Sequence, residues 1–304
     1  MKTARTHIHK QRGFTLVEAI IVMVLTGIVA GVMVLFIRQP VQNYVDAAAR
    51  ADLTDTADLA LRRMARELRT ALPNSIRTTF NNGVWFVQFI PTTGGGQYLA
   101  VEDNATSGIP LSFTDTHALQ FDVVGPMPAV AVNGIIAIYN LGNEIIDADA
   151  YYSGEPSADP REMNRQAVGA VAGHTITLAS LTNTNVFAVP ANAGRTPNTS
   201  PEHRFHVIGQ PVTFRCEGNA NGTGTLARIV TDFSAAQPQP ALAPDTPLLA
   251  TNVLACDFSA TQAGSLHSAL IGMTLSLARP RVGGAANGLE TVTLVHQIHV
   301  DNTP

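Results

Sequence analysis

The clearest pattern in the chain is a long apolar segment close to the N-terminus. Residues 19–37 are apolar apart from Thr26 and two glycines. As a helix rising 1.5 Å per residue, this stretch and the turn before it are long enough to cross a bilayer core of about 30 Å. The segment therefore predicts a transmembrane helix over residues 14–38.

A second, different helical pattern follows almost without a linker. Residues 41–72 contain no glycine, and apolar side chains recur at steps of three and four residues, with charged residues on the opposite face. Pro73-Asn74 ends the pattern, so residues 39–74 are predicted to form an amphipathic half-helix. Pro40 either begins a new helix or kinks one long helix. The apolar positions are Leu53, Ala57, Ala60 or Leu61, Met64, Leu68 and Leu72.

Beyond Ser75 the hydrophobic period changes to two, which predicts strands. A Gly- and Asn-rich run at 218–224 predicts a hairpin loop, and residues 140–164 are expected to form a long surface loop. Residues 75–304 are therefore expected to form one β-rich globular domain around one core. The predicted fold class is α+β, a long N-terminal helix packed on a mostly antiparallel sheet. The predicted strands are 84–90, 117–124, 135–139, 175–178, 204–208, 212–216, 226–230, 273–277 and 291–300.

Charge is distributed unevenly about the apolar segment. Residues 1–13 carry four basic residues and no acid, so the tendency of positive charge to stay inside predicts a cytoplasmic N-terminus. The residues after Gln39 then lie on the other side of the membrane. Without residues 1–13 the chain has 15 arginines against 23 acidic residues and no lysine, a formal net charge of −8. Electrostatic binding to nucleic acid is therefore not expected.

A cleaved secretory signal peptide is the alternative interpretation of the N-terminus. Its apolar region would be 7–15 residues long and would end at a small-residue cleavage site. The apolar segment here is longer, contains Glu18 near its start, and meets a small-residue run only at Ala47-Ala48-Ala49. A retained membrane helix is therefore favoured.

The two cysteines, Cys216 and Cys256, are candidates for a disulfide. An even pair outside the cytoplasm favours oxidation, while two separate thiols remain the alternative. Two cysteines without further ligands make a poor zinc site.

Candidate catalytic and metal-binding residues are sparse. The chain lacks a nucleophile elbow, a phosphate-binding glycine loop and a His-Glu-x-x-His motif. The pairs His203/His206 and His296/His299 are spaced so that residues in a strand would point to opposite faces, so neither pair is expected to chelate a metal.

One acidic stretch could coordinate calcium by its composition. It contains Glu144, Asp147, Asp149 and Glu155, but lacks the glycine and the bidentate acid of an EF-hand loop. A solvated acidic loop is the favoured interpretation, and no cofactor is expected.

Glu18 is the remaining candidate, because a carboxylate within hydrocarbon is costly. It either lies at the cytoplasmic edge and reaches the headgroups, or it pairs with a cation created by processing. Cleavage after Gly13 would place a charged amine on Phe14, one helical turn from Glu18. Formed between subunits, such a pair would set the register of an assembly, since neither charge is stable unpaired in a low dielectric.

The run Gly13-Phe14-Thr15-Leu16-Val17-Glu18 after a short basic leader resembles the class III signal of type IV pilins and type II secretion pseudopilins. This resemblance implies that a prepilin peptidase removes residues 1–13 and methylates the new N-terminal Phe14. It also implies that Glu18 helps to recruit and register subunits. The implied partners are the peptidase, other minor and major pilin subunits, the inner-membrane assembly platform and the lipid bilayer.

Weaker resemblances point to a subtype. Residues 63–75 are similar to the helix end of J-like minor pseudopilins. Residues 204–207, 212–216 and 294–302 resemble the O-type minor pilin of mannose-sensitive haemagglutinin (MSHA) pilus systems. Many major pilins have a kinking proline where this chain has Leu35.

The resemblance implies a non-enzymatic minor pilin or pseudopilin. It would be anchored by one span in the inner membrane, with residues 39–304 in the periplasm and a position at or near the tip of a filament. A J-like pseudopilin of a type II secretion system is the alternative within the family. A membrane-tethered envelope enzyme or binding protein is the alternative from a different class, and it would require convergent polar groups in a pocket.

Overall fold

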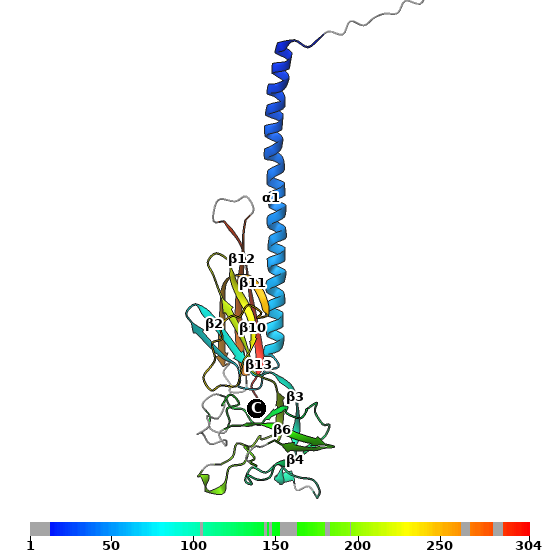
Figure 1. Ribbon diagram of the computed structural model, residues 1–304, viewed down its shortest axis with the longest axis vertical. Helices are drawn as coiled ribbons and strands as arrows, with labels where there is room; N and C mark the ends of the chain where they lie inside the picture. The colour runs from blue at the N-terminus through cyan, green and yellow to red at the C-terminus, as the bar shows by residue number, and fades with distance from the viewer. Residues whose placement is uncertain are drawn as a thin grey trace, which may run out of the picture.

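A computed structural model gives the arrangement of the chain (Figure 1). It describes residues 13–103, 106–142, 145, 148–152, 163–179, 183–194, 196–262, 268–281 and 288–304. One long helix, α1, runs into a seven-stranded antiparallel sheet, and a closed six-stranded barrel lies at the end opposite the start of the helix. The fold is α+β, consistent with a pilin-like arrangement, as the sequence predicts.

Helix α1 spans Leu16–Leu68 without a break, so Pro40 lies inside one continuous helix. The helix ends four residues before the expected Leu72, and tertiary hydrogen bonds explain the difference. The Leu72 N–H donates to the Ile90 carbonyl and the Thr92 N–H donates to the Thr70 carbonyl. These bonds draw the chain after Leu68 away from the helix axis and onto the start of the barrel.

The sheet contains both ends of the β-rich region. Its order is β1-β2-β9-β10-β11-β12-β13, and every pairing is antiparallel. The strands are β1 (Arg77–Asn81), β2 (Val84–Phe89), β9 (Val212–Glu217), β10 (Gly224–Val230), β11 (Leu248–Gln262), β12 (Ser268–Pro280) and β13 (Leu289–Asp301). The turn between β9 and β10 is the predicted hairpin.

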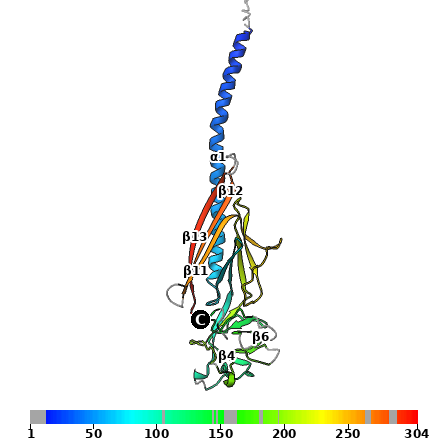
Figure 2. The same cartoon turned by 90° about the vertical axis from the view of Figure 1, so that its left-hand side faces the viewer.

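The second half of α1 packs its apolar stripe onto this sheet. Leu53, Ala57, Leu61, Met64 and Leu68 are at most 2 % exposed and share one core with apolar residues of the sheet. The sheet lies along one side of the helix, as Figures 1 and 2 show. Burying these side chains supplies the main attraction between helix and sheet.

Ion pairs flank this apolar contact. Arg50 and Arg281 both bind the carboxylate of Glu290 on β13, whose side chain is only 4 % exposed. Further along the helix, Glu67 accepts a hydrogen bond from Arg228 of β10 at 2.7 Å. These charged contacts fix the helix in rotation and along its axis, because each requires one register of helix against strand.

The sheet bends sharply in β11. Asn252 has a left-handed φ of 60°, and the pairing registers on both sides of β11 shift near Val253. Gly224 of β10 pairs with Val253 at the bend, and glycine is required there because a Cβ would lie 2.5 Å from the Val253 carbonyl oxygen.

A disulfide lies in the same part of the sheet. Cys216 of β9 is bonded to Cys256 of β11, which confirms the predicted pair. The two strands are not neighbours in the sheet, since β10 lies between them. The bond therefore links β9 to β11 across the intervening strand β10.

The barrel is an insertion between two adjacent strands of the sheet. The chain leaves β2, builds the barrel, and returns at β9, which pairs with β2. The barrel order is β3-β4-β7-β6-β5-β8, with β8 closing on β3. Its strands are β3 (Thr92–Tyr98), β4 (Gln120–Val124), β5 (Ile135–Ala137), β6 (Arg165–Ala172), β7 (Thr175–Leu178) and β8 (Arg204–Ile208), with short 3₁₀ helices at Val101–Asp103 (η1) and Ala191–Ala193.

The barrel has its own apolar core, which corrects the expectation of one core. Phe121, Ile136, Val168, Ile176 and Phe205 fill its interior and are fully buried. Closing a sheet on itself turns one face of every strand inward, so the barrel buries these side chains without the helix. Strands β1, β3, β6 and β11 were not predicted, and β3 lacked a signal because it contains Gly94-Gly95-Gly96.

Replacing Cys216 and Cys256 with serine should destabilise the globular part. The bond closes a loop of 40 residues, for which the chain-entropy model gives a cost of about 3–4 kcal/mol. Denaturant unfolding of the full chain in detergent micelles measures the loss. Reductant should lower the stability of the parent protein but not of the variant. Equal stability of parent and variant in the absence of reductant would contradict the prediction.

Replacing Glu290 with glutamine should weaken the contact between helix and sheet. Hydrogen bonds from Arg50 hold the pKa of Glu290 below its ordinary value of 4.5, and Arg281 adds to the effect. A lowered pKa stabilises the fold above about pH 4.5, and this contribution is lost as pH falls through the lower folded value. We expect the variant to lose about 1 kcal/mol at pH 7.

The same variant should show a shallower fall in unfolding free energy below pH 4.5. Asp245 is exposed and lies outside this ion-pair cluster, so Asp245→Asn is the matched control and should change neither quantity. If the unfolding free energy of Glu290→Gln fell below pH 4.5 as steeply as that of the parent, the assignment of this pH dependence to Glu290 would be contradicted.

Candidate functional site

The start of α1 brings three predicted site residues together. Gly13 and Phe14 precede the helix, and Thr15 caps it by accepting a hydrogen bond from the Glu18 backbone N–H at 3.3 Å. A cap of this kind satisfies one of the free N–H groups of the first turn. Glu18 therefore lies in the first turn, where a carboxylate also interacts favourably with the helix dipole.

Both residues that flank the predicted cleavage site are accessible. Phe14 is 81 % exposed, and no atom lies within 4 Å of a Cβ placed on Gly13. The Glu18 side chain is exposed as well. An enzyme can therefore approach the Gly13–Phe14 bond without unfolding the helix. The preceding residues 1–12 lie outside the described part of the chain.

The first half of α1 has no partner within the described chain. Between Leu16 and Ile37, the large apolar side chains that the structure describes are exposed, in contrast to the buried stripe of the second half. It is the one described helix that is long and apolar enough to span a membrane. Such a surface in water would be strongly unfavourable, so this half fits a membrane anchor.

Comparison with known families agrees with this geometry. Residues 8–34 match the family described as "Prokaryotic N-terminal methylation motif". The chain carries a type IV pilin-like N-terminal methylation motif. No curated protein and no solved structure matches the chain.

The match supports the pilin and pseudopilin family and covers the cleavage site, Glu18 and most of the apolar half-helix. Together with the single apolar helix it fits a membrane-anchored protein that is processed by prepilin peptidase and assembles with other pilins. The motif does not reach the sheet or the barrel.

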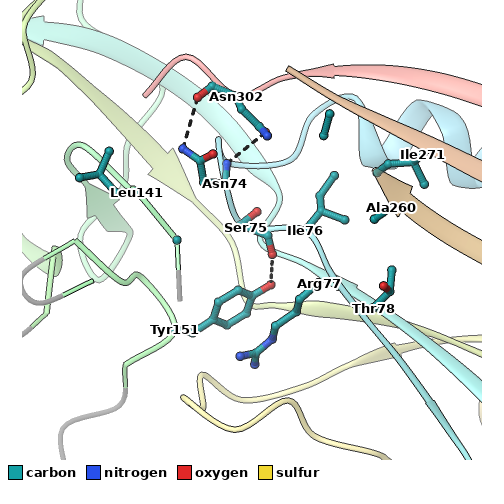
Figure 3. Close-up of a pocket in the computed structure, with 12 residues that line it drawn as sticks. Asn74, Ser75, Ile76, Arg77, Thr78, Leu141, Tyr151, Ala260, Ile271 and Asn302 are labelled. Carbon is teal, nitrogen blue, oxygen red and sulfur yellow. Dashed lines mark hydrogen bonds between the residues drawn. The ribbon is translucent and has the colours of Figure 1, made fainter. Parts of the chain in front are cut away.

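A cavity of about 360 Å³ lies where helix end, sheet and barrel meet (Figure 3). Asn74 donates two hydrogen bonds to Asn302, one from its backbone N–H to Asn302 Oδ1 and one from its side-chain amide to the Asn302 carbonyl. The Tyr151 hydroxyl donates to the Ser75 carbonyl at 2.7 Å. These hydrogen bonds tie the barrel and the C-terminus to the end of α1.

Arg77 closes one wall of this cavity. Its guanidinium lies 3.7 Å from the centroid of the Tyr151 ring and donates to the side chain of Gln88 and to the carbonyls of Ser234 and Ala235. Burial lowers the pKa of Arg77 and raises that of Tyr151. Because the guanidinium donors already bond protein groups, we assign this cavity a structural role.

A second arginine, Arg165, is likewise stacked on an aromatic ring and bonded to backbone carbonyls, on the barrel side of the junction. It stacks over Phe233 at 3.9 Å and donates to the carbonyls of Ala150 and Tyr152. Burial lowers its pKa to about 10, so it stays charged at neutral pH. Residues 148–151 are buried, which corrects the expectation that the whole of 140–164 is a surface loop.

The acidic stretch is only partly described. Glu144, Asp147 and Glu155 lie outside the described residues. Asp149 is 5 % exposed and accepts a hydrogen bond from the Tyr151 backbone N–H at 2.9 Å. Its carboxylate therefore contributes to the junction between barrel and sheet.

The histidine pairs take separate positions. His203 precedes β8 in a left-handed conformation with φ of 55°, while His206 lies within the strand. Burial lowers the pKa of His206. His296 and His299 lie on β13, and the described residues hold no group of three side chains able to bind a metal.

Sequence reasoning missed the junction because its residues come from distant segments. Asn74, Tyr151 and Asn302 show no local motif, and only folding places them in contact. The N-terminal signal, by contrast, is formed by consecutive residues.

Proposed function

We propose that this chain is a minor pilin or pseudopilin, a non-enzymatic structural subunit that anchors in the inner membrane and packs its helix into a filament or its initiating complex. The observation that carries the proposal is the methylation motif at the exposed start of a helix whose first half is apolar on all sides. The expected processing is cleavage after Gly13 and methylation of Phe14.

The roles of the two halves of α1 support assembly through the helix. The second half is fixed to the sheet, so any partner must use the first half or the outer side of the second. Glu18 of one subunit and the new amine of Phe14 in a neighbour would then neutralise each other within the membrane.

The size of the outer part supports a low-copy position near a tip. The barrel extends beyond the C-terminal end of α1, away from the membrane-spanning half (Figure 1). Bulk at that end would meet the next subunit in a repeating array. We therefore favour a minor subunit over a filament-forming one.

Within the family, the resemblance of residues 204–207, 212–216 and 294–302 favours an MSHA-type minor pilin of the O type. A J-like pseudopilin of a type II secretion system is the second candidate, favoured by residues 63–75. Gene neighbourhood separates the two, since pilus and secretion genes differ. A tethered envelope enzyme would require a catalytic cluster in the globular part.

Mass spectrometry of the purified protein tests processing. In cells with an active prepilin peptidase the chain should begin at methylated Phe14, because the Gly13–Phe14 bond is exposed. In cells without the peptidase the leader should remain. An intact leader in the presence of the active peptidase would overturn the proposal.

Replacing Glu18 with alanine tests the register. Membrane insertion should be retained, because the change makes the span more apolar. Incorporation into the assembly should fall about tenfold, since the amine of a neighbouring Phe14 loses its partner. Asp245→Ala removes an exposed acid of the globular part and is the control. Normal incorporation of Glu18→Ala would contradict the register role but not the processing.

A further inference from the structure

A second cavity, of about 290 Å³, opens at the far end of the barrel. Strand β3 enters the barrel at Thr92, next to the end of α1, and leaves it at Tyr98 beside this cavity. Helix η1, the loop around Phe113 and the residues before β8 complete its wall. The barrel that holds this cavity lies beyond the sheet from the membrane-spanning half of α1, an order of helix, sheet and barrel that Figure 1 shows.

Aromatic rings form the floor and one wall. The ring centroids of Tyr98 and Phe113 are 5.5 Å apart, and those of Tyr98 and His203 are also 5.5 Å apart. The Tyr98 ring is fixed, because its hydroxyl donates to the Ser200 carbonyl at 3.4 Å and its side chain is buried. Tyr98 therefore supports the wall from behind, and the partly exposed rings of Phe113 and His203 form its accessible apolar surface.

The opposite side is acidic. Glu102 lines the cavity, and Asp103 lies beside it with one carboxylate oxygen 3.6 Å from Nδ1 of His203. The other oxygen of Asp103 accepts the Ala100 backbone N–H at 2.8 Å, which fixes the carboxylate. Glu102 and Asp103 thus put two carboxylates at this side of the cavity, and carboxylates attract a cation rather than an anion.

His203 is held in an uncommon conformation at this site. Its φ of 55° lies in the left-handed region, which a non-glycine residue adopts only when the surroundings impose it. The surroundings here are two backbone bonds, from the His203 N–H to the Ser200 carbonyl and from the Tyr98 N–H to the His203 carbonyl. They hold the imidazole against the aromatic wall, next to Asp103.

We propose that this cavity binds an organic ammonium group carried on an apolar chain or ring, with the ammonium beside Glu102 and Asp103 and the carbon part against Phe113 and His203. A cation next to carboxylates and aromatic faces gains both ionic and cation–π attraction. The proposal goes beyond the assembly role, because it gives the membrane-distal barrel a ligand-binding activity.

Other ligand classes fit the site less well. An anion would meet two carboxylates. A bare metal ion needs several ligands on one centre, and the described residues contain no cluster of three candidates. A volume of about 290 Å³ is close to the lower end of the range for small-molecule sites, so one side chain or small amine is the expected size.

Two probes that differ in the ammonium group test the site. Nα-acetyl-lysine amide and Nα-acetyl-norleucine amide, each at about 10 mM, are compared by saturation-transfer difference NMR with the full chain in non-ionic detergent micelles. We expect binding of the lysine probe that weakens as salt is added, and no binding of the norleucine probe. Equal binding of the two, or no binding of either, would overturn the proposal.

Variants then assign the binding to this cavity. Asp103→Asn and Glu102→Gln should each weaken binding of the lysine probe roughly fivefold, and Phe113→Leu should weaken it as well. The matched control is Asp245→Asn, an exposed acid outside the cavity, which should bind as the parent does. Unchanged binding in all three cavity variants would overturn the assignment. The measurement uses purified protein, so its result is independent of whether the chain assembles.

Discussion

The packing of the apolar stripe of α1 against the sheet is the interaction on which the rest of the molecule depends. Leu53, Met64 and Leu68 are buried in one core with strands from both ends of the sheet. Without the helix, the inner face of that sheet would be exposed to water. The same contact leaves the first half of α1 free of the globular part, so one helix serves as both a membrane anchor and a core element.

The ion pairs around Glu290 and Glu67 add precision to that contact. Hydrophobic burial is not directional, and a smooth apolar stripe could slide or rotate on a sheet. The pairs Arg50–Glu290 and Arg228–Glu67 are satisfied in one register only. If Glu18 sets the register between subunits, the globular part must be fixed relative to Glu18, and these pairs provide that rigidity.

The barrel is joined to the sheet more firmly than a typical insertion. Its first and last strands, β3 and β8, pair with each other directly beyond β2 and β9. Arg77 and Arg165, each stacked on an aromatic ring, brace the same boundary from two sides. Any ligand bound at the far end of the barrel would therefore be presented on a stiff extension of the helix axis.

Consecutive residues were enough to determine much of this protein. The apolar span, the amphipathic second half-helix and the Gly13–Glu18 motif were all predictable, because helix formation and peptidase recognition depend on neighbouring positions. Strands with clear alternation, such as 175–178 and 204–208, were predicted with the bounds that the structure has. The disulfide was also predictable, because only two cysteines are present.

Tertiary structure decided the rest. The helix ends at Leu68 because Thr70 and Leu72 form backbone hydrogen bonds with Thr92 and Ile90. The division into sheet and barrel depends on the pairings β2–β9 and β3–β8, which join residues more than a hundred positions apart. The distal cavity needs Tyr98, Phe113 and His203 in contact. Such placements follow from long-range pairing and closure of the barrel, and local periodicity contains no information about either.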